Sequence, residues 1–367
     1  MKLRYLAISA AAVLAAIPIG GLARYEAGRG ESCGACHEIR CNLDSWHGSS
    51  HRGVKCSECH ADAFTLDPGF HLGNLRRLVA HVRGKVDDPV RLRNADIPEM
   101  MERCRKCHRQ EFAQWQSGPH SVTYAAIFLD KKHNTRETPM DDCLRCHGMA
   151  FEGGARELMM PLDRTGPWRL KDPSLAGQPA IPCLACHQIH REGKPLGSRQ
   201  REHPGLSRDQ ELFRPSLALY DRRERVHFSV ALLPVPAMRD GARPVRMSRD
   251  PRQSLCYQCH APDATMQVAS GDDRTAVGVH EGLSCFACHQ GHGQQTRASC
   301  ANCHPRLSNC GLDVEKMDTT FASAASRHNV HFVKCVDCHP KGVPQHKRVE
   351  PAMMETSGAA RPAPQGE

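Results

Sequence analysis

The sequence predicts a fold of mainly short α-helices and irregular loops, with little β-structure, wrapped around covalently bound groups rather than around an aromatic core. Three observations lead to this fold class. The pattern Cys-x-x-Cys-His occurs nine times in 367 residues. Phe, Trp and Tyr together make up only 5% of the chain, which is little for a core of this size. No stretch shows a convincing alternation of apolar and polar residues with the period of two that is typical of strands.

The nine motifs contain eighteen of the 20 cysteines. Two thiols at this spacing can reach the two vinyl groups of one porphyrin, and the adjacent histidine then ligates the iron. A zinc site needs paired half-sites of matched spacing, and a redox Cys-x-x-Cys occurs singly, so the pattern favours neither. The sequence therefore predicts a multihaem c-type cytochrome with about nine covalently attached haem c groups. The predicted thioether cysteines are Cys33, Cys36, Cys56, Cys59, Cys104, Cys107, Cys143, Cys146, Cys183, Cys186, Cys256, Cys259, Cys285, Cys288, Cys300, Cys303, Cys335 and Cys338. The predicted proximal ligands are His37, His60, His108, His147, His187, His260, His289, His304 and His339.

Fourteen further histidines are enough to supply a distal ligand to every iron. Ligation by two histidines saturates the iron and favours electron transfer over catalysis. For each histidine the alternative is a surface or propionate-binding role, and for Met149, a weaker candidate ligand, it is packing. The first candidates, which lie beside motifs or in a short sub-repeat, are His51, His120, His190, His280, His292, His328 and His331. The next are His47, His71, His81, His133, His227 and His346.

The chain begins like an exported protein. Lys2 and Arg4 precede an apolar run from Leu6 to Ile19. This pattern predicts either a cleaved signal peptide or an uncleaved membrane anchor over residues 1–24. Either alternative places the haem-binding part in the periplasm, anchored to the inner membrane if the segment is retained, or outside the cell.

Motif spacing divides the rest of the chain. Residues 25–187 form a predicted five-haem module and residues 256–346 a four-haem module, joined by an Arg- and Pro-rich connecting segment over 188–255. The tail over 347–367 is predicted to be disordered. Apolar residues at helical spacing predict a helix from His71 to Val82.

The formal net charge of +9 does not predict a nucleic-acid partner, because no aromatic-interleaved basic stripe accompanies it. Much of the Arg and Lys is better interpreted as partners of haem propionates. Cys41 and Cys310 stand outside the motifs. A disulfide between them and two isolated thiols are both open alternatives.

The N-terminal part, to about His147, resembles the NapC/NirT family of membrane-anchored periplasmic cytochromes, which includes the NrfH type. The resemblance rests on the apolar start, on the CGACH and CSECH motifs with Ser49 and His51 between them, and on the stretch VAHVRGKVDDPV before CRKCH. It implies oxidation of membrane quinol and electron delivery to a periplasmic reductase. In the family a Met often follows the first motif, where this chain has Glu38 and Ile39. A Lys and an Asp near the first haem form the family's quinol site, for which Lys85 with Asp87 or Asp88 are the positional candidates.

Three functions follow from these features. The favoured one is respiratory electron transfer from a membrane quinol or quinol dehydrogenase to a periplasmic or outer-membrane redox partner. The second is a multihaem reductase of a small nitrogen or sulfur species, although no CxxCK motif marks a catalytic haem. The third is a subunit of a haem filament or porin–cytochrome conduit, as a homo- or hetero-oligomer. The chain is thus expected to be an electron carrier rather than a catalyst.

Overall fold

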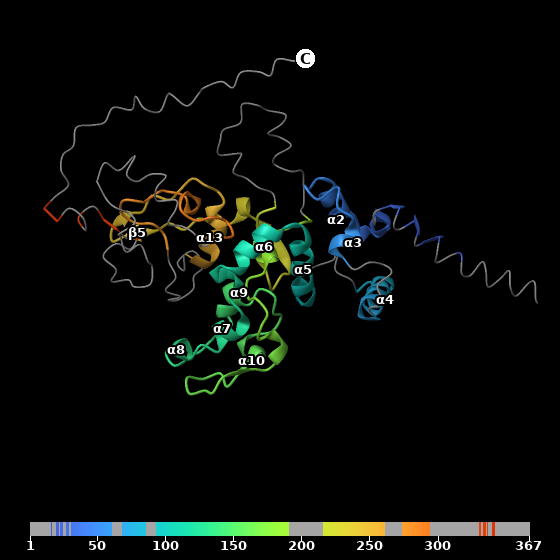
Figure 1. The fold of residues 1–367 in the computed structure, drawn as a ribbon, viewed down its shortest axis with the longest axis horizontal. Helices are drawn as coiled ribbons and strands as arrows, with labels where there is room; N and C mark the ends of the chain where they lie inside the picture. The colour runs from blue at the N-terminus through green and yellow to red at the C-terminus, as the bar shows by residue number, and fades with distance from the viewer. Residues whose placement is uncertain are drawn as a thin grey trace, which may run out of the picture.

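The computed structural model describes residues 31–60, 68–85, 93–190, 216–260 and 274–293, with single residues in 16–28 and 330–341. Along the long axis of the molecule, α2, α3 and α4 lie toward one end and α13 and β5 toward the other, with α5 and α6 between them (Figure 1). The helices α7, α8 and α10 project below this row in the same view (Figure 1).

The described elements are short, as the sequence predicts. The α-helices are α2 (His37–His47), α3 (Cys56–Cys59), α4 (Pro68–Val82), α5 (Ile97–Cys107), α6 (Arg109–Gln116), α7 (Tyr124–Phe128), α8 (Lys131–Asn134), α9 (Cys143–His147), α10 (Ala155–Leu158) and α13 (Gln253–His260). The 3-10 turns are η1 (Glu31–Ala35), η2 (Asn94–Asp96), η3 (Pro119–Ser121), η4 (Pro173–Leu175), η5 (Cys183–Ala185), η6 (Val230–Leu232) and η7 (Cys285–Ala287). The strands are β1 (Met159–Met160), β2 (Arg169–Leu170), β3 (Ala218–Asp221), β4 (Val226–Ser229), β5 (Arg239–Asp240) and β6 (Arg243–Pro244).

The prediction of little β-structure is confirmed for the described residues. Each sheet there is a two-stranded antiparallel hairpin: β1 with β2, β3 with β4, and β5 with β6. The longest hairpin, β3–β4, pairs Ala218 with Ser229 and Asp221 with Val226. The predicted connecting segment over 188–255 therefore contains two hairpins within 216–255.

The predicted helix over 71–82 is confirmed as α4, which begins earlier, at Pro68. Proline fits the first turn because its missing N–H would have no intrahelical partner there. The helix ends before Gly84, which has a φ of 61° and so adopts the left-handed conformation that glycine tolerates.

Two clusters of buried side chains form the conventional core. The first packs α7, α9, α10 and the β1–β2 hairpin together through Tyr124, Phe128, Leu144, Leu158 and Leu170. The rings of Tyr124 and Phe128 are stacked with centroids 6.0 Å apart.

The second cluster joins α5 and η5 to the β3–β4 hairpin through Ile97, Leu184 and Tyr220. Met149 belongs to this cluster and is only 2% exposed. The Tyr220 hydroxyl donates a hydrogen bond to the Asn94 side chain in the same region. The hairpin is therefore packed into the molecule on the side of the motif at Cys183.

Several predictions fall on residues that the structure does not describe. They are most of the segment 1–24, the tail 347–367, and the motifs at Cys300 and Cys335. Among the described residues, each helix is either too short or too polar to cross a lipid bilayer.

Candidate haem centres

Six described motifs, those that begin at Cys56, Cys104, Cys143, Cys183, Cys256 and Cys285, lie on single helical turns, whereas Cys36 of the first motif has an extended backbone between η1 and α2. Residues three apart in a helix share a face, so both thiols of a motif point to one side of the turn. In the motifs at Cys56, Cys104, Cys183 and Cys285 the backbone N–H of the motif histidine donates to the carbonyl oxygen of the first cysteine, over 2.8–3.0 Å. The sequence thus builds the same local shape at widely separated places, with two thiols and an imidazole projecting from one short turn.

Six motif histidines face a second histidine. The ring centroids are 5.5–6.2 Å apart in the pairs His37–His81, His51–His108, His60–His190, His120–His260, His187–His292 and His289–His331. In each pair one ring belongs to a Cys-x-x-Cys-His motif and the other does not. The pairing therefore repeats a single arrangement at six motifs.

This spacing fits an iron bound between the two rings. Two metal–imidazole bonds of about 2 Å, and about 1 Å from each nitrogen to its ring centre, put two axial rings about 6 Å apart. Ordinary aromatic pairs also have centroids about 4.5–7 Å apart, so the argument for ligation rests on the recurrence of the pair at six motifs and not on the spacing alone. The donor set is also appropriate, since two imidazoles together with two thioether-forming cysteines are the ligation expected for haem c.

The imidazoles in the interior are kept neutral, as ligation requires. Burial, followed by the neighbouring His292, lowers the pKa of His187 to about 4. Burial, followed by His289, likewise lowers the pKa of His331 to about 4. Burial and the nearby His108 also lower the pKa of His51. A neutral ring offers a nitrogen lone pair to a metal at every physiological pH.

Several motif thiols do not resemble those of a redox Cys-x-x-Cys, although the hydrogen bond with Cys256 lowers the pKa of Cys285. Burial, and then the neighbouring thiols of Cys183 and Cys59, raise the pKa of Cys104 to about 11. Burial and Cys183 raise the pKa of Cys186 to about 11. Reactive thiols have a lowered pKa, so these environments suit thioether attachment rather than thiolate chemistry.

Motif cysteines from different parts of the chain meet. A hydrogen bond to Cys146, followed by burial, raises the pKa of Cys259. A hydrogen bond between Cys256 and Cys285 raises the pKa of Cys256 in the same way. Cys186 is close enough to Cys256 and Cys259 to raise the pKa of both thiols further. The motif that begins at Cys256 therefore adjoins the motifs at Cys143, Cys183 and Cys285.

The seven first candidates for a distal ligand can be compared with the ring contacts in the structure. Five of them face a motif histidine: His51, His120, His190, His292 and His331. The Nδ1 atom of His280 donates to the backbone carbonyl of Val330 over 3.0 Å, which fixes the ring. His328 lies outside the described residues.

Among the next six candidates for a distal ligand, His81 faces His37. His227 instead donates from Nε2 to the Leu184 carbonyl over 2.8 Å and packs on the Tyr220 ring at 5.1 Å. His133 Nδ1 lies 3.3 Å from the Asn134 amide oxygen, and His47 packs against Trp46. Nothing is described of the His71 side chain, and His346 lies outside the described residues.

One buried carboxylate was not anticipated from the sequence. Glu38, directly after His37, is 3% exposed and forms a cluster with His37 and His81 in which one ligand atom from each residue lies within 4.8 Å of the others. Its position in the sequence does not predict that the side chain is buried beside two histidines, because Glu is common in the first turn of a helix.

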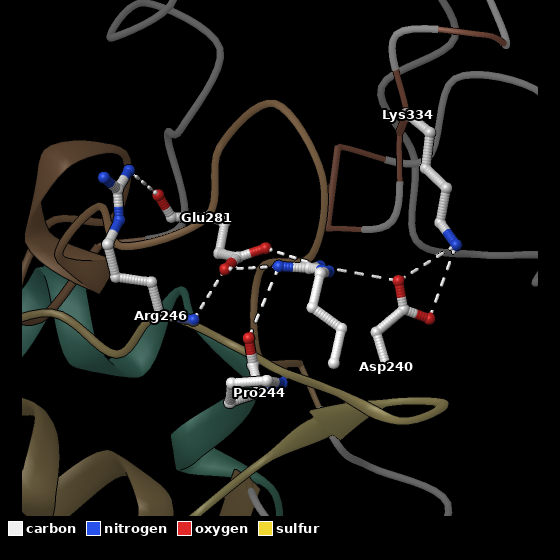
Figure 2. A network of polar contacts seen from close by, with 6 residues as sticks. Asp240, Pro244, Arg246, Glu281 and Lys334 are labelled. Atoms are coloured by element: carbon white, nitrogen blue, oxygen red, sulfur yellow. Dashed lines mark hydrogen bonds and ion pairs between the residues drawn. The ribbon is translucent and has the colours of Figure 1, made fainter.

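A polar network holds the loop around His280 in place (Figure 2). Glu281 accepts two hydrogen bonds from the Arg243 guanidinium, at 2.9 and 2.8 Å, and one from the Arg246 backbone N–H at 2.6 Å. These contacts, with the Arg243 side-chain hydrogen bond first, lower the pKa of Glu281 to about 2. Asp240 pairs with Lys334 at 3.2 Å, immediately before the motif at Cys335. The β5–β6 hairpin thus connects two segments that carry predicted haem ligands.

A backbone contact aligns the same loop with His331. The N–H of Val277 donates to the His331 carbonyl over 2.7 Å, and the N–H of Val279 to the Val333 carbonyl over 3.1 Å. Gly278, between them, has a φ of 95°, and a Cβ there would overlap the Val333 carbonyl oxygen. Glycine is required at this close approach.

Comparison with known proteins identifies two cytochrome regions. Residues 29–196 match the family model of MtrC/MtrF-like outer membrane cytochromes, domains II/IV. Residues 241–305 match the cytochrome c3 model. No curated protein and no solved structure matches the chain. The first match contains five of the Cys-x-x-Cys-His motifs and all but a few residues of the described N-terminal half.

Proposed function

We propose that this multihaem c-type cytochrome is an electron conduit, in which electrons pass between haems held at neighbouring motifs. Bound at a motif, a haem supplies a one-electron carrier. The family matches establish multihaem electron transfer as the general function. The number of haems, the ligand assignments and the direction of transfer are parts of the proposal.

The proximity of cysteines of different motifs carries the proposal. A thioether cysteine sits at the porphyrin edge, so two adjoining cysteines bring two edges together. Cys59 and Cys183 each lie close enough to Cys104 to raise the pKa of its thiol. Together with the neighbours of Cys256, these contacts give a path from the motif at Cys56 through Cys104 and Cys183 to Cys256. The motifs at Cys143 and Cys285 branch from its far end.

The six histidine pairs supply the second requirement of a conduit. Two neutral imidazoles on one iron leave it no open coordination position, and catalysis by a haem needs such a position. We therefore assign His81, His51, His190, His292, His120 and His331 as distal ligands of the motif histidines that they face. The reductase alternative would require an iron without such a pair.

Electron movement after injection of a single electron tests the path. We expect pulse radiolysis of the full holoprotein to show rapid intramolecular redistribution that is independent of protein concentration. The double variant Cys183→Ala with Cys186→Ala removes the central link and is expected to slow redistribution. The matched control, Cys143→Ala with Cys146→Ala, removes a branch and should leave the main path intact.

Intact mass checks that each variant has lost one haem, and far-UV circular dichroism checks that it remains folded. Unchanged redistribution after loss of the central motif would refute the path. A high-spin ferric signal in the wild-type protein, with reoxidation by a nitrogen or sulfur oxyanion, would instead support the reductase.

The location that we propose is the outside of the cytoplasmic membrane, with a membrane at one end of the path. The MtrC/MtrF-like match supports an outer-membrane or extracellular setting with a porin–cytochrome complex or a periplasmic cytochrome as partner. The resemblance to the NapC/NirT family supports a membrane quinol or quinol dehydrogenase as the electron donor. Both settings place the conduit beside lipid.

Helix α4 provides a surface for that lipid. Leu72, Leu75, Leu78, Val79 and Val82 share one face and are 40–78% exposed, whereas the less exposed positions are the small residues Gly73 and Ala80. At about 100° per residue these small residues fall on the opposite face. The helix therefore turns its large apolar side chains outward.

Basic residues lie along one edge of this apolar face. Arg76 and Arg83 are exposed beside it on the helix wheel. A helix with an apolar face and basic flanks lies in the interface of an anionic bilayer. Because α4 also carries His81, such binding would hold the first motif close to the membrane. We propose that the occupant of this face is an anionic phospholipid surface.

Hydrogen exchange of the full holoprotein tests the lipid contact. We expect the amides of Gly69–Val82 to be protected in anionic nanodiscs relative to detergent, and those of α6, a helix of polar surface, to be unchanged. Equal exchange of α4 in both media would contradict the proposal. Protection that depends on protein concentration but not on lipid would point to a second copy of the chain instead.

A further inference from the structure

Glu38 occupies a position in α2 that would ordinarily be apolar. Its side chain shares the buried face of the helix with Ser45 and Trp46 and is 4% exposed. Carboxylates are rarely buried without a partner, because removal of the charge from water is costly. The arrangement therefore requires a specific partner for Glu38.

That partner is His81. The Nδ1–H of His81 donates a hydrogen bond to Oε1 of Glu38, which joins α2 to α4. The same oxygen is 3.5 Å from Nε2 of His37. With Nδ1 engaged in this way, Nε2 of His81 carries the lone pair and is the ligating nitrogen.

Other histidines are oriented by neutral acceptors. His190 Nδ1 donates to the backbone carbonyl of Asn42 over 2.9 Å, and His280 Nδ1 donates to that of Val330 over 3.0 Å. Glu111 is the acidic neighbour of His108, but it lies 3.9 Å away, beyond hydrogen-bonding distance. Among these histidines, His81 differs because Nδ1, the nitrogen that does not ligate the metal, donates its hydrogen bond to a charged carboxylate.

We propose that Glu38 is a positioning residue that orients His81 and lowers the reduction potential of the first haem. This inference rests on the proposed function, because it takes His37 and His81 as the two axial ligands. A carboxylate acceptor makes an imidazole a stronger electron donor to its metal. It also places a negative charge beside a centre that is one unit more positive when ferric than when ferrous.

The redox step itself is simple. One electron from the donor converts ferric iron to ferrous iron. No bond forms or breaks at Glu38 or His81, and neither residue gains or loses a proton. The carboxylate stabilises the ferric side of this equilibrium. A first haem of lowered potential gives up its electron readily to the remaining haems, which suits the start of a path.

The variant Glu38→Gln tests the charge while keeping an oxygen that can accept the His81 hydrogen bond. Loss of a second-shell partner commonly changes properties at a metal site by about 10- to 100-fold. Applied to the ferric–ferrous equilibrium, this is an upward shift of about 59 to 118 mV, at 59 mV per tenfold for one electron. We expect the shift in a single one-electron component of a spectropotentiometric titration, with the low-spin signal retained.

Two further variants complete the test. Asp163→Asn removes an exposed carboxylate that lies outside the motifs and whose side chain accepts hydrogen bonds from its own turn, and it should leave every component nearly unchanged. Glu38→Asp retains the charge and should keep the low potential, even if Glu38→Gln folds poorly.

An unshifted titration of a correctly folded, low-spin Glu38→Gln protein would overturn the inference and leave the conduit standing. A change from low to high spin in this variant would also overturn it, since Glu38 would then act as an iron ligand itself. Failure of the conduit would appear in the wild-type protein instead, as a high-spin signal before any substitution.

Discussion

Asp250 connects two haem-binding motifs, and its removal should destabilise the C-terminal part of the path. It is 7% exposed. It accepts hydrogen bonds from the Arg252 guanidinium at 2.9 and 2.7 Å, at the start of α13, and from the Ser284 hydroxyl at 2.6 Å, just before η7. Arg252 also lies over the Phe286 ring, at 4.3 Å. The turn before Cys256 is thereby fixed to the turn that begins at Cys285.

The size of the effect follows from these contacts. A hydrogen bond to a charged group contributes about 1.5–3 kcal/mol. Removing one partner of a buried ion pair costs about 3–5 kcal/mol, because the other charge is left uncompensated. We therefore expect Asp250→Ala to lower the free energy of unfolding of the holoprotein by about 3–5 kcal/mol. Ser284→Ala removes the bond to Asp250, worth about 1.5–3 kcal/mol, and also the cap that the Ser284 hydroxyl offers to the Phe286 N–H at 3.2 Å, worth about 1 kcal/mol.

The destabilisation should depend on pH in a defined direction. Burial by itself raises the pKa of the Asp250 carboxyl, but hydrogen bonds from Arg252 and Ser284 outweigh it and leave the pKa below its usual value. A carboxyl with a lowered folded pKa stabilises the protein above its unfolded pKa of about 3.9, and this contribution is lost as the pH falls through the folded value. The difference between wild type and Asp250→Ala should thus be full near neutral pH and shrink in acid.

Denaturant unfolding of the holoproteins at pH 7 and at a series of acidic pH values measures this difference in the free energy of unfolding. Asp163→Ala is the control, since the Asp163 side chain is exposed and accepts hydrogen bonds within its own turn, from Thr165 and Gly166, while the bond from Trp168 goes to its backbone carbonyl and is kept. A loss below about 1 kcal/mol for Asp250→Ala, or a loss that grows in acid, would refute the reasoning.

Four further predictions concern single sites or the whole chain. His292→Ala should convert one haem, that of the motif at Cys183, from low spin to high spin in the electron paramagnetic resonance spectrum, and His120→Ala should do so for the motif at Cys256; an unchanged spectrum would contradict the pairing. Phe128→Ala, at a position 1% exposed, should lower the free energy of unfolding by about 3–5 kcal/mol in denaturant titrations. Gly278→Ala should destabilise by at least about 1 kcal/mol, because the left-handed backbone and the nearby Val333 carbonyl both oppose a Cβ, whereas Gly177→Ala, where a Cβ meets nothing within 4 Å, should not. The chain without haem should give no cooperative melting transition by circular dichroism, since haem replaces the missing aromatic core; a compact apoprotein with a sharp transition would show otherwise.

Local features were predictable from the sequence and long-range ones were not. The helical turns at the motifs follow from the i, i+3 spacing of the cysteines, and α4 follows from its apolar period. That period predicts a helix but not the direction of its apolar face. An amphipathic helix ordinarily buries this face, whereas α4 exposes it.

The choice of distal histidine shows why proximity in sequence is a poor guide. His190 lies three residues after the motif histidine His187 but faces His60, and His292 lies three after His289 but faces His187. A distal ligand must approach the flat macrocycle from the face opposite the motif histidine. A residue on the same turn cannot cross to that face, so it faces the histidine of another motif instead. The same reasoning explains why His81, from a separate helix, faces His37.

The histidine pairs also bear on how the chain assembles. His187 faces His292, and His120 faces His260, so in each pair the partners lie on opposite sides of the predicted connecting segment and more than a hundred residues apart. Closing a loop of that length costs about 4 kcal/mol in chain entropy beyond a constant term. Packing of the β3–β4 hairpin offsets part of this cost. The Ala218 N–H donates to the Cys186 carbonyl at 3.0 Å, and Gln188 to Ser216 at 2.9 Å, which fixes the chain beside the motif at Cys183 before residue 292 is reached. A five-haem module and a four-haem module that each supplied its own ligands would need none of these crossings. Under the ligation that we propose, ligation and hairpin packing together make each half necessary for the completion of the other.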